Sequence, residues 1–201
     1  MAEPRRSELI LASASPFRRR MLEAAGLSFR VVPAEVDEAA IRRRVPTADL
    51  ARVAETLALA KAQAVSKTLP NALVIGADQV LALGDQLFSK PMDVNEARAQ
   101  LEKLRGQAHH LHTAAALAQA GEILWSHTET ARLVMRSFSD AFLDRYLARM
   151  GAKVLQTVGA YEIEGHGIQL FERVEGDSFT IIGLPLLALL AELRARGAIE
   201  T

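Results

Sequence analysis

Two hydroxyl groups and two guanidinium groups stand together near the beginning of the chain: Ser13, Ser15, Arg18 and Arg19. The apolar run Glu8–Ala12 before them predicts a buried strand, and Pro16 after the potential N-cap Ser15 predicts the start of a helix. Such a junction offers free backbone N–H groups, and guanidinium groups pair well with phosphate oxygens. The stretch therefore fits a phosphate site, although a serine cap followed by a solvated basic face explains the same residues equally well.

Several familiar motifs are missing. The sequence has no GxxxxGK[ST], no GxGxxG after a strand and no GxSxG, which argues against a P-loop nucleotide hydrolase, a dinucleotide-binding enzyme and a serine hydrolase. His109, His110 and His112 invite a metal hypothesis, because alternate residues of a strand share one face. No carboxylate completes a ligand set nearby, so a partly exposed strand with polar side chains is the favoured interpretation.

Composition limits the remaining choices. The 201 residues are 50% hydrophobic, enough for one domain with its own core. Twenty-four basic and 24 acidic side chains leave no net charge, so we expect neither a nucleic acid nor a membrane as partner. Cysteine is absent, which excludes disulfides and thiolate metal sites. Residues 1–7 do not resemble a signal peptide, and Gly183 and Pro185 interrupt the longest apolar stretch, 181–191, so a soluble cytoplasmic protein is expected.

Strand and helix patterns alternate along the chain. We expect strands over 8–12, 29–32, 72–77, 80–83, 86–88, 109–118, from 123 onward, over 168–174 and over 179–182. We expect helices over 16–26, 47–69, 95–104, 139–150 and 185–196, a loop or short helix over 35–46, and an irregular loop over 159–167. Alternating strands and helices predict an α/β fold in a single domain spanning 1–201 that has two lobes around a cleft, and the mixture of hairpins and crossovers argues against a pure doubly wound sheet.

Five separated strings carry a resemblance to a known family: LASASPFRRRML at 11–22, VDE at 36–38, IGADQV at 75–80, SKP at 89–91, and GIQLFERVEGD at 167–177 continuing through FTIIGLPL to 186. Together they closely resemble the Maf family, the septum-formation-inhibitor-like nucleotide pyrophosphatases. The resemblance implies a long curved mixed sheet with flanking helices and a central cleft, similar to the inosine triphosphate pyrophosphatases. It also implies metal-dependent hydrolysis of a nucleoside triphosphate between its α and β phosphates, which releases a monophosphate and pyrophosphate.

The resemblance also implies roles for individual residues. Those on the phosphates are Ser13, Arg18, Arg19, Lys61 and Lys90. Glu38 and Asp78 are the acidic members and would hold Mg²⁺ or Mn²⁺, and the catalytic set is Asp78, Glu38 and Lys61. Asp78 would act as the proton acceptor, as a metal ligand or as both. Taken without the family, the favoured interpretation of Asp78 is a turn residue at a strand end, and the alternatives are a solvated helix face for Lys61 and a loop charge for Lys90.

Three further positions indicate which base is recognised. Phe17, Gln79 and Glu164 differ from the pattern of relatives that resemble pyrimidine triphosphate hydrolases, and they resemble the branch acting on 7-methylguanosine triphosphate. Methylation at N7 makes guanine cationic, so an aromatic face such as Phe17 would gain ~0.5 to 2 kcal/mol by stacking on it. Glu164 would accept from the guanine N1–H and amino group, while Gln79 reads the remaining edge. The alternative places Phe17 in the core and Glu164 in solvent.

Other functions remain open at this point. Within the family, dTTP or UTP is the alternative substrate. Outside enzymology, the same site would serve a nucleotide-binding module that regulates cell division, although a pure binder does not need carboxylates beside phosphates. We favour an enzyme that removes selected nucleotides from the pool, with a homodimer as the general expectation for a small soluble enzyme.

Overall fold

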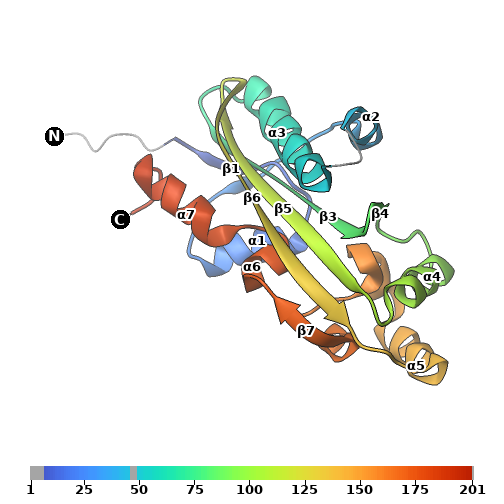
Figure 1. The fold of residues 1–201 in the computed structure, drawn as a ribbon. Coiled ribbons are helices and arrows are strands. Elements are labelled where there is room, and N and C mark those ends of the chain that lie inside the picture. The colour runs from blue at the N-terminus through green and yellow to red at the C-terminus, as the bar shows by residue number, and fades with distance from the viewer. Residues whose placement is uncertain (1–6, 46–48, 201) are drawn as a thin grey trace. The chain divides into compact units, whose positions relative to one another are not determined.

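A computed structural model of the chain describes residues 7–45 and 49–200. It confirms the predicted α/β class: the described strands form one mixed seven-stranded sheet in the order β2-β1-β3-β5-β6-β7, with β4 paired to β3. The strands are β1 (Leu9–Leu11), β2 (Arg30–Val31), β3 (Leu73–Leu83), β4 (Gln86–Phe88), β5 (Ala108–Gln119), β6 (Glu122–Met135) and β7 (Phe171–Glu175). Figure 1 shows the three long strands, β3, β5 and β6, running side by side.

The chain divides into two compact units, and these long strands contribute to both. The first unit contains the described residues up to 79 together with 113–129 and 183–200, and the second contains 80–112 and 130–182. Whether the chain works as one domain with two lobes stays a prediction.

The first unit carries α1 (Pro16–Ala24), α2 (Glu38–Arg44), α3 (Leu50–Thr68) and α7 (Leu186–Ala195). Local sequence explains where the first three of these helices begin. Ser15 caps α1 with Pro16 in its first turn, and Asp37 and Asp49 accept hydrogen bonds from backbone N–H groups at the starts of α2 and α3. The expected helix over 47–69 is confirmed from Leu50 onward, and Thr47 and Ala48 lie outside the described residues.

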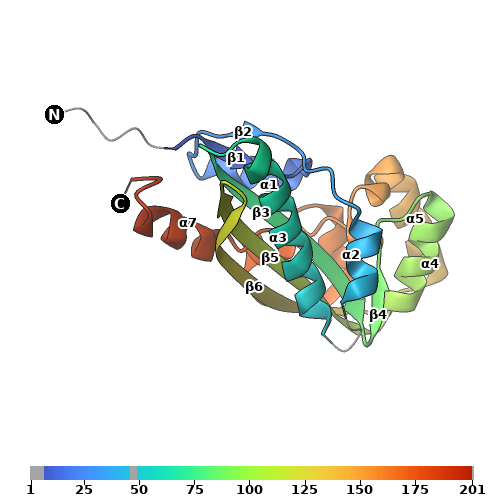
Figure 2. The same ribbon diagram turned by 90° about the horizontal axis from the view of Figure 1, so that it is seen from above.

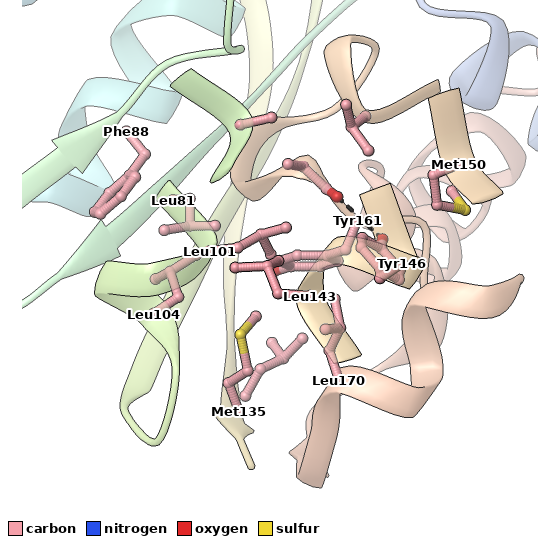
Figure 3. Packing of buried hydrophobic residues seen from close by; sticks show 14 of the residues in the cluster. Leu81, Phe88, Leu101, Leu104, Met135, Leu143, Tyr146, Met150, Tyr161 and Leu170 are labelled. Atoms are coloured by element: carbon pink, nitrogen blue, oxygen red, sulfur yellow. Dashed lines mark hydrogen bonds between the residues drawn. The ribbon is translucent and has the colours of Figure 1, made fainter. Parts of the chain in front are cut away.

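The second unit carries α4 (Val94–Leu104), α5 (Asp140–Met150) and α6 (Ser178–Ile182), with three short 3₁₀ helices, η1 (Gly151–Leu155), η2 (Val158–Ala160) and η3 (His166–Leu170). Its core is a cluster of buried side chains drawn from α4, α5, the strands and the segment after α5, shown in Figure 3. Tyr146 and Tyr161 lie within this cluster, so two hydroxyl groups are buried among apolar side chains.

Three sequence expectations need correction. Residues 179–182 are helical rather than extended, because Asp177 Oδ2 accepts from Thr180 N at 2.9 Å and so caps α6 despite its β-branched residues. The strand expected over 168–174 begins only at Phe171, after η3. Asp78 does not end a strand but lies inside β3, since a buried neighbouring cation allows a carboxylate to remain in the middle of an otherwise apolar strand.

Candidate active site

Pairing between β1 and β3 brings two distant motifs to one place. The two strands are parallel, with Leu11 opposite Ile75, and Ala12 N donates to Ile75 O at 2.8 Å. Ser13 follows Ala12 directly, and Asp78 lies just beyond Ile75 on the next strand. The register therefore places Ser13, just after the end of β1, beside the middle of β3 that carries Asp78, and both residues are buried.

Gly76 sets the distance between β3 and α3. A Cβ atom at this position would lie 2.2 Å from Ala58 O and 2.6 Å from Ala62 N, closer than any side chain can approach. The helix therefore packs directly on the strand, as the view of α3 along β3 in Figure 2 shows. This close packing brings Lys61, the neighbour of Ala62 on α3, against Asp78 of β3.

Lys61 joins the two predicted acidic residues. Its Nζ donates to Asp78 Oδ1 at 2.5 Å and lies 2.7 Å from Glu38 Oε1. Lys61 and Asp78 are only 9% and 5% exposed, which rules out the solvated helix face for Lys61. Asp78 Oδ2 is also buried and has no hydrogen-bond partner among the described residues. The arrangement thus holds one carboxylate oxygen on a cation and leaves the other able to accept a proton or a metal ion.

Arg18 is the second buried cation of the site. Its Nε donates to the Gly183 carbonyl oxygen at 2.8 Å, and its Nη1 donates to Ser13 Oγ at 3.1 Å. Ser13 Oγ also accepts from Ser15 N at 3.2 Å, so the turn before α1 is held on its hydroxyl. These contacts fix the guanidinium group beside the positive end of α1, where an anion is stabilised.

Electrostatic coupling supports this grouping. Burial lowers the pKa of Arg18, and the negative charges of Asp78 and Glu38 oppose that shift. Burial by itself raises the pKa of Glu38, but the hydrogen bond from Lys61 and the charges of Lys61, Arg42 and Arg18 bring it below its ordinary value. Two cations and two carboxylates therefore form one interacting cluster in the first unit.

The structure does not bring every residue of the first predicted motif into this cluster. Arg19 is exposed and pairs with Glu23 at 2.7 Å, one turn further along α1. Phe17 is half-buried and is absent from the core, and the Arg20 guanidinium lies over its ring at 4.7 Å from the centroid. The alternative interpretation, with Phe17 in the core and Glu164 in solvent, therefore does not hold for Phe17, whereas Glu164 is exposed as that alternative expects.

Gln79 follows Asp78 on β3 and is oriented by a neighbouring strand. Its Nε2 donates to Thr113 Oγ1 of β5 at 2.9 Å. A Cβ atom on Gly183 would lie 3.9 Å from both Gln79 Oε1 and Arg18 Nε. Gln79 therefore lies beside the same backbone carbonyl segment that holds Arg18.

Two predicted residues belong to the second unit. Lys90 is exposed in the segment between β4 and α4, next to Ser89, whose carbonyl oxygen accepts from Gln100 Nε2 at 2.9 Å. Glu164 is exposed in the turn that follows Tyr161. Both positions leave the charged groups accessible to a ligand.

The histidine hypothesis has a clear outcome. Among the described residues, no cluster of three or more histidine, aspartate or glutamate side chains has a metal-binding arrangement. His109 is fully buried, and its Nε2 is hydrogen-bonded to the Tyr161 hydroxyl at 2.9 Å. His110 and His112 stack on each other on the half-exposed face of β5. The polar-strand interpretation holds for His110 and His112, whereas His109 is a buried core residue.

Sequence reasoning missed the residues that support the site. Gly76, Thr113 and the Gly183 carbonyl oxygen position Lys61, Gln79 and Arg18, and none of them was singled out. A glycine inside an apolar strand pattern indicates close backbone approach, so Gly76 could have been identified from the sequence. The contacts of Thr113 and Gly183 depend on long-range pairing that carries no local signal.

Comparisons with known proteins show the family of the chain. The model of the Maf family, described as Maf-like protein, matches residues 8–196. The chain belongs to the Maf family. A 7-methyl-GTP pyrophosphatase of Mesorhizobium japonicum is 52% identical over 195 residues, covering 96% of this chain and 98% of the relative. A nucleoside triphosphate pyrophosphatase of Paramagnetospirillum magneticum is 52% identical over 190 residues, covering 94% and 98%.

Among solved structures, a nucleoside-triphosphatase (dITP/XTP pyrophosphatase) of Mycobacterium abscessus covers 94% of this chain and 95% of its own at 17% identity with a TM-score of 0.42, too weak a likeness to bear on the site. No helix in the described part of the chain has both the length and the apolar character needed to cross a bilayer.

Proposed function

We propose that this Maf protein is a nucleoside triphosphate pyrophosphatase, which cleaves the bond between the α and β phosphates. The observation that carries the proposal is the Lys61 ammonium group bound to both Asp78 and Glu38, with one buried oxygen of Asp78 that has no partner among the described residues. Relatives about half identical over nearly the whole chain bear names of pyrophosphatases, which supports the same conclusion.

The phosphate chain would bind where cations and hydroxyls converge. A triphosphate carries about four negative charges, and its hydrolysis spreads charge over oxygens that cations must meet. Arg18 and Ser13 offer a fixed guanidinium and a hydroxyl at the start of α1. Lys90 is the further phosphate ligand that we expect, and Arg19, whose Nε is paired with Glu23 in solvent, is a weaker candidate.

Asp78 would act as the general base. Lys61 holds Oδ1, so Oδ2 is the oxygen able to accept a proton from a water molecule. That water oxygen forms a bond to the α phosphorus while the bond from this phosphorus to the bridging oxygen breaks. The products are a nucleoside monophosphate and pyrophosphate, and the proton remains on Asp78 until it passes to solvent.

The residues present fit a divalent metal ion. Mg²⁺ is commonly held by one or two carboxylates together with phosphate oxygens and water. Asp78 Oδ2 is a buried carboxylate oxygen with no partner in the described part of the chain, and Glu38 is a half-exposed carboxylate on the same ammonium group. Glu38 would hold Mg²⁺ or Mn²⁺, and Asp78 Oδ2 would be a second ligand only when it is not accepting the proton; the ion would neutralise charge on the phosphates when bound.

We propose 7-methyl-GTP as the substrate. The half-buried ring of Phe17 has the Arg20 guanidinium over one face, which supports the proposal that this ring attracts a cationic base. Gln79 is held in one orientation by Thr113, which suits it to reading a base edge. The exposed Glu164 carboxylate can accept two hydrogen bonds from guanine, whereas uracil and thymine present an oxygen beside their single N–H.

A regulatory module without catalysis is the competing proposal. A site built only for binding gains nothing from two carboxylates next to the phosphate ligands, because like charges repel. A cytoplasmic location and a homodimer stay predictions.

The test is pyrophosphate release from a panel of 7-methyl-GTP, GTP, dTTP and UTP, with Mg²⁺, with Mn²⁺ and with a chelator. We expect metal-dependent release, fastest from 7-methyl-GTP. Arg18→Ala should lower kcat/KM about 10- to 100-fold for all four alike, because it loses a charged hydrogen bond to phosphate. Arg19→Ala is the matched comparison and should cost less. Tight nucleotide binding without turnover would favour the regulatory module.

A further inference from the structure

The segment after α5 that carries Glu164 is built as a closed turn. Gly165 N donates to Glu162 O at 3.2 Å, and Ile168 N donates to Gly165 O at 3.2 Å. A Cβ atom at Gly167 would lie 2.5 Å from Glu162 O and 2.8 Å from Glu162 N, so the two ends of the turn touch through their backbones. Glu164 is thus at the exposed tip of a turn with little room to rearrange.

The buried end of this turn is Tyr161. Its hydroxyl is hydrogen-bonded to His109 Nε2 at 2.9 Å, and its backbone oxygen accepts from Thr157 Oγ1 at 2.8 Å. The Tyr161 ring also meets Phe171 edge to face, with centroids 4.8 Å apart. His109 is 0% exposed, and its Nδ1 has no partner among the described residues. The proposed catalytic mechanism and the binding of phosphate do not involve His109 or Tyr161.

A second anchor lies beside the first. Tyr146 of α5 donates from its hydroxyl to the Ala160 carbonyl oxygen at 3.0 Å, and its ring stacks on His166 at the far end of the turn. Figure 3 shows Tyr146 and Tyr161 together in the core of the second unit. The turn is therefore tied to buried side chains of α5 and β5 on both sides of Glu164.

We propose that the His109–Tyr161 pair is a positioning element that fixes the orientation of Glu164 and thereby sets the discrimination between bases. This inference rests on the proposed function, because it assigns a role within the same site. An apolar pair of similar shape would fill the core equally well without a buried donor and acceptor. The hydrogen bond instead gives the Tyr161 ring one fixed place, and Glu162, the next residue, starts the turn from there.

The test compares base selectivity in a double-mutant cycle. Selectivity is the ratio of kcat/KM for 7-methyl-GTP to kcat/KM for UTP, measured for the wild type, Tyr161→Phe, Glu164→Gln and the double variant. Tyr161→Phe keeps the ring and removes the hydroxyl, and we expect it to lower the ratio about tenfold. In the Glu164→Gln background the same change should have no further effect, because Tyr161 acts through Glu164.

Two further variants guard against a general loss of structure. Gly167→Ala disturbs the turn from its other end and should lower the ratio in the same way. Phe138→Leu alters the same core at a ring that packs on Phe142, and it should leave the ratio unchanged. Equal losses for both nucleotides in Tyr161→Phe, or additive effects in the cycle, would overturn the inference.

Amide hydrogen exchange separates this inference from the proposed function. We expect Tyr161→Phe to speed exchange several-fold over residues 162–168 and to leave α3 unaffected. A wild type that releases no pyrophosphate from any triphosphate contradicts the proposed function, and unchanged exchange over 162–168 contradicts the positioning role independently of any turnover.

Discussion

Replacing Lys61 by methionine should destabilise the protein more than any ordinary surface change. The substitution keeps most of the side-chain volume and removes the ammonium group, which leaves Asp78 buried at 5% exposure without its cation. Breaking a buried ion pair in this way costs about 3 to 5 kcal/mol. Glu38 adds less, since its half-exposed carboxylate can be hydrated. For a chain of this size the loss corresponds to a fall in Tm of about 10 °C.

The assay is urea unfolding monitored by circular dichroism, in the presence of a chelator and without nucleotide. Lys67→Met on the exposed side of α3 is the matched control, and we expect it to change the free energy of unfolding by less than about 1 kcal/mol. In an Asp78→Asn background the cost of Lys61→Met should fall by at least about half, because no buried charge is then left unpaired. A loss below about 1 kcal/mol for Lys61→Met, or the same loss in both backgrounds, would refute the reasoning.

Three other predictions follow from the same contacts. Asp78→Asn should lower kcat for pyrophosphate release by about 10²-fold or more while nucleotide binding persists, measured by turnover and titration; activity within tenfold of wild type would remove its role as base. Gly76→Ala should cost several kcal/mol in urea unfolding, because its Cβ would overlap Ala58 O. Burial and the charge of His110 lower the pKa of His109 to about 4. As the pH falls, His109 is therefore protonated in the unfolded chain before it is protonated in the folded protein. The free energy of unfolding should fall by about 3 kcal/mol as the pH drops from 6.5 to 4. His109→Gln should flatten that part of the pH profile, and an unchanged profile would contradict the assignment.

Local signals predicted the elements around the site well. Ser15 and Pro16 mark the start of α1, and the strands expected over 80–83 and 86–88 pair with each other as the end of β3 and β4. The β-branched run in 179–182 misled the prediction, because one side-chain cap from Asp177 outweighs a weak strand propensity. Propensity decides little in so short a segment.

The family resemblance implied roles for individual residues, but their positions and contacts could not be predicted from it. The motif around Arg18 and Arg19 treats the two alike, yet one is buried on Ser13 and Gly183 and the other pairs with Glu23 in solvent. Their difference follows from the side of α1 on which each lies: Arg18 is on the side that contacts Gly183, and Arg19 is on the exposed side. The bridge from Lys61 to Asp78 depends on the register of β1 and β3 and on the close approach at Gly76, and neither is visible before the strands are paired.

The most direct test of the central claim is the identity of the products formed from 7-methyl-GTP. Wild-type protein with Mg²⁺ should convert it to 7-methyl-GMP and pyrophosphate in equal amounts, and Asp78→Asn should form neither at a comparable rate. The nucleotide product is identified by chromatography, and pyrophosphate is measured by a separate assay. Formation of 7-methyl-GDP and inorganic phosphate, or no turnover of any triphosphate, would contradict the account.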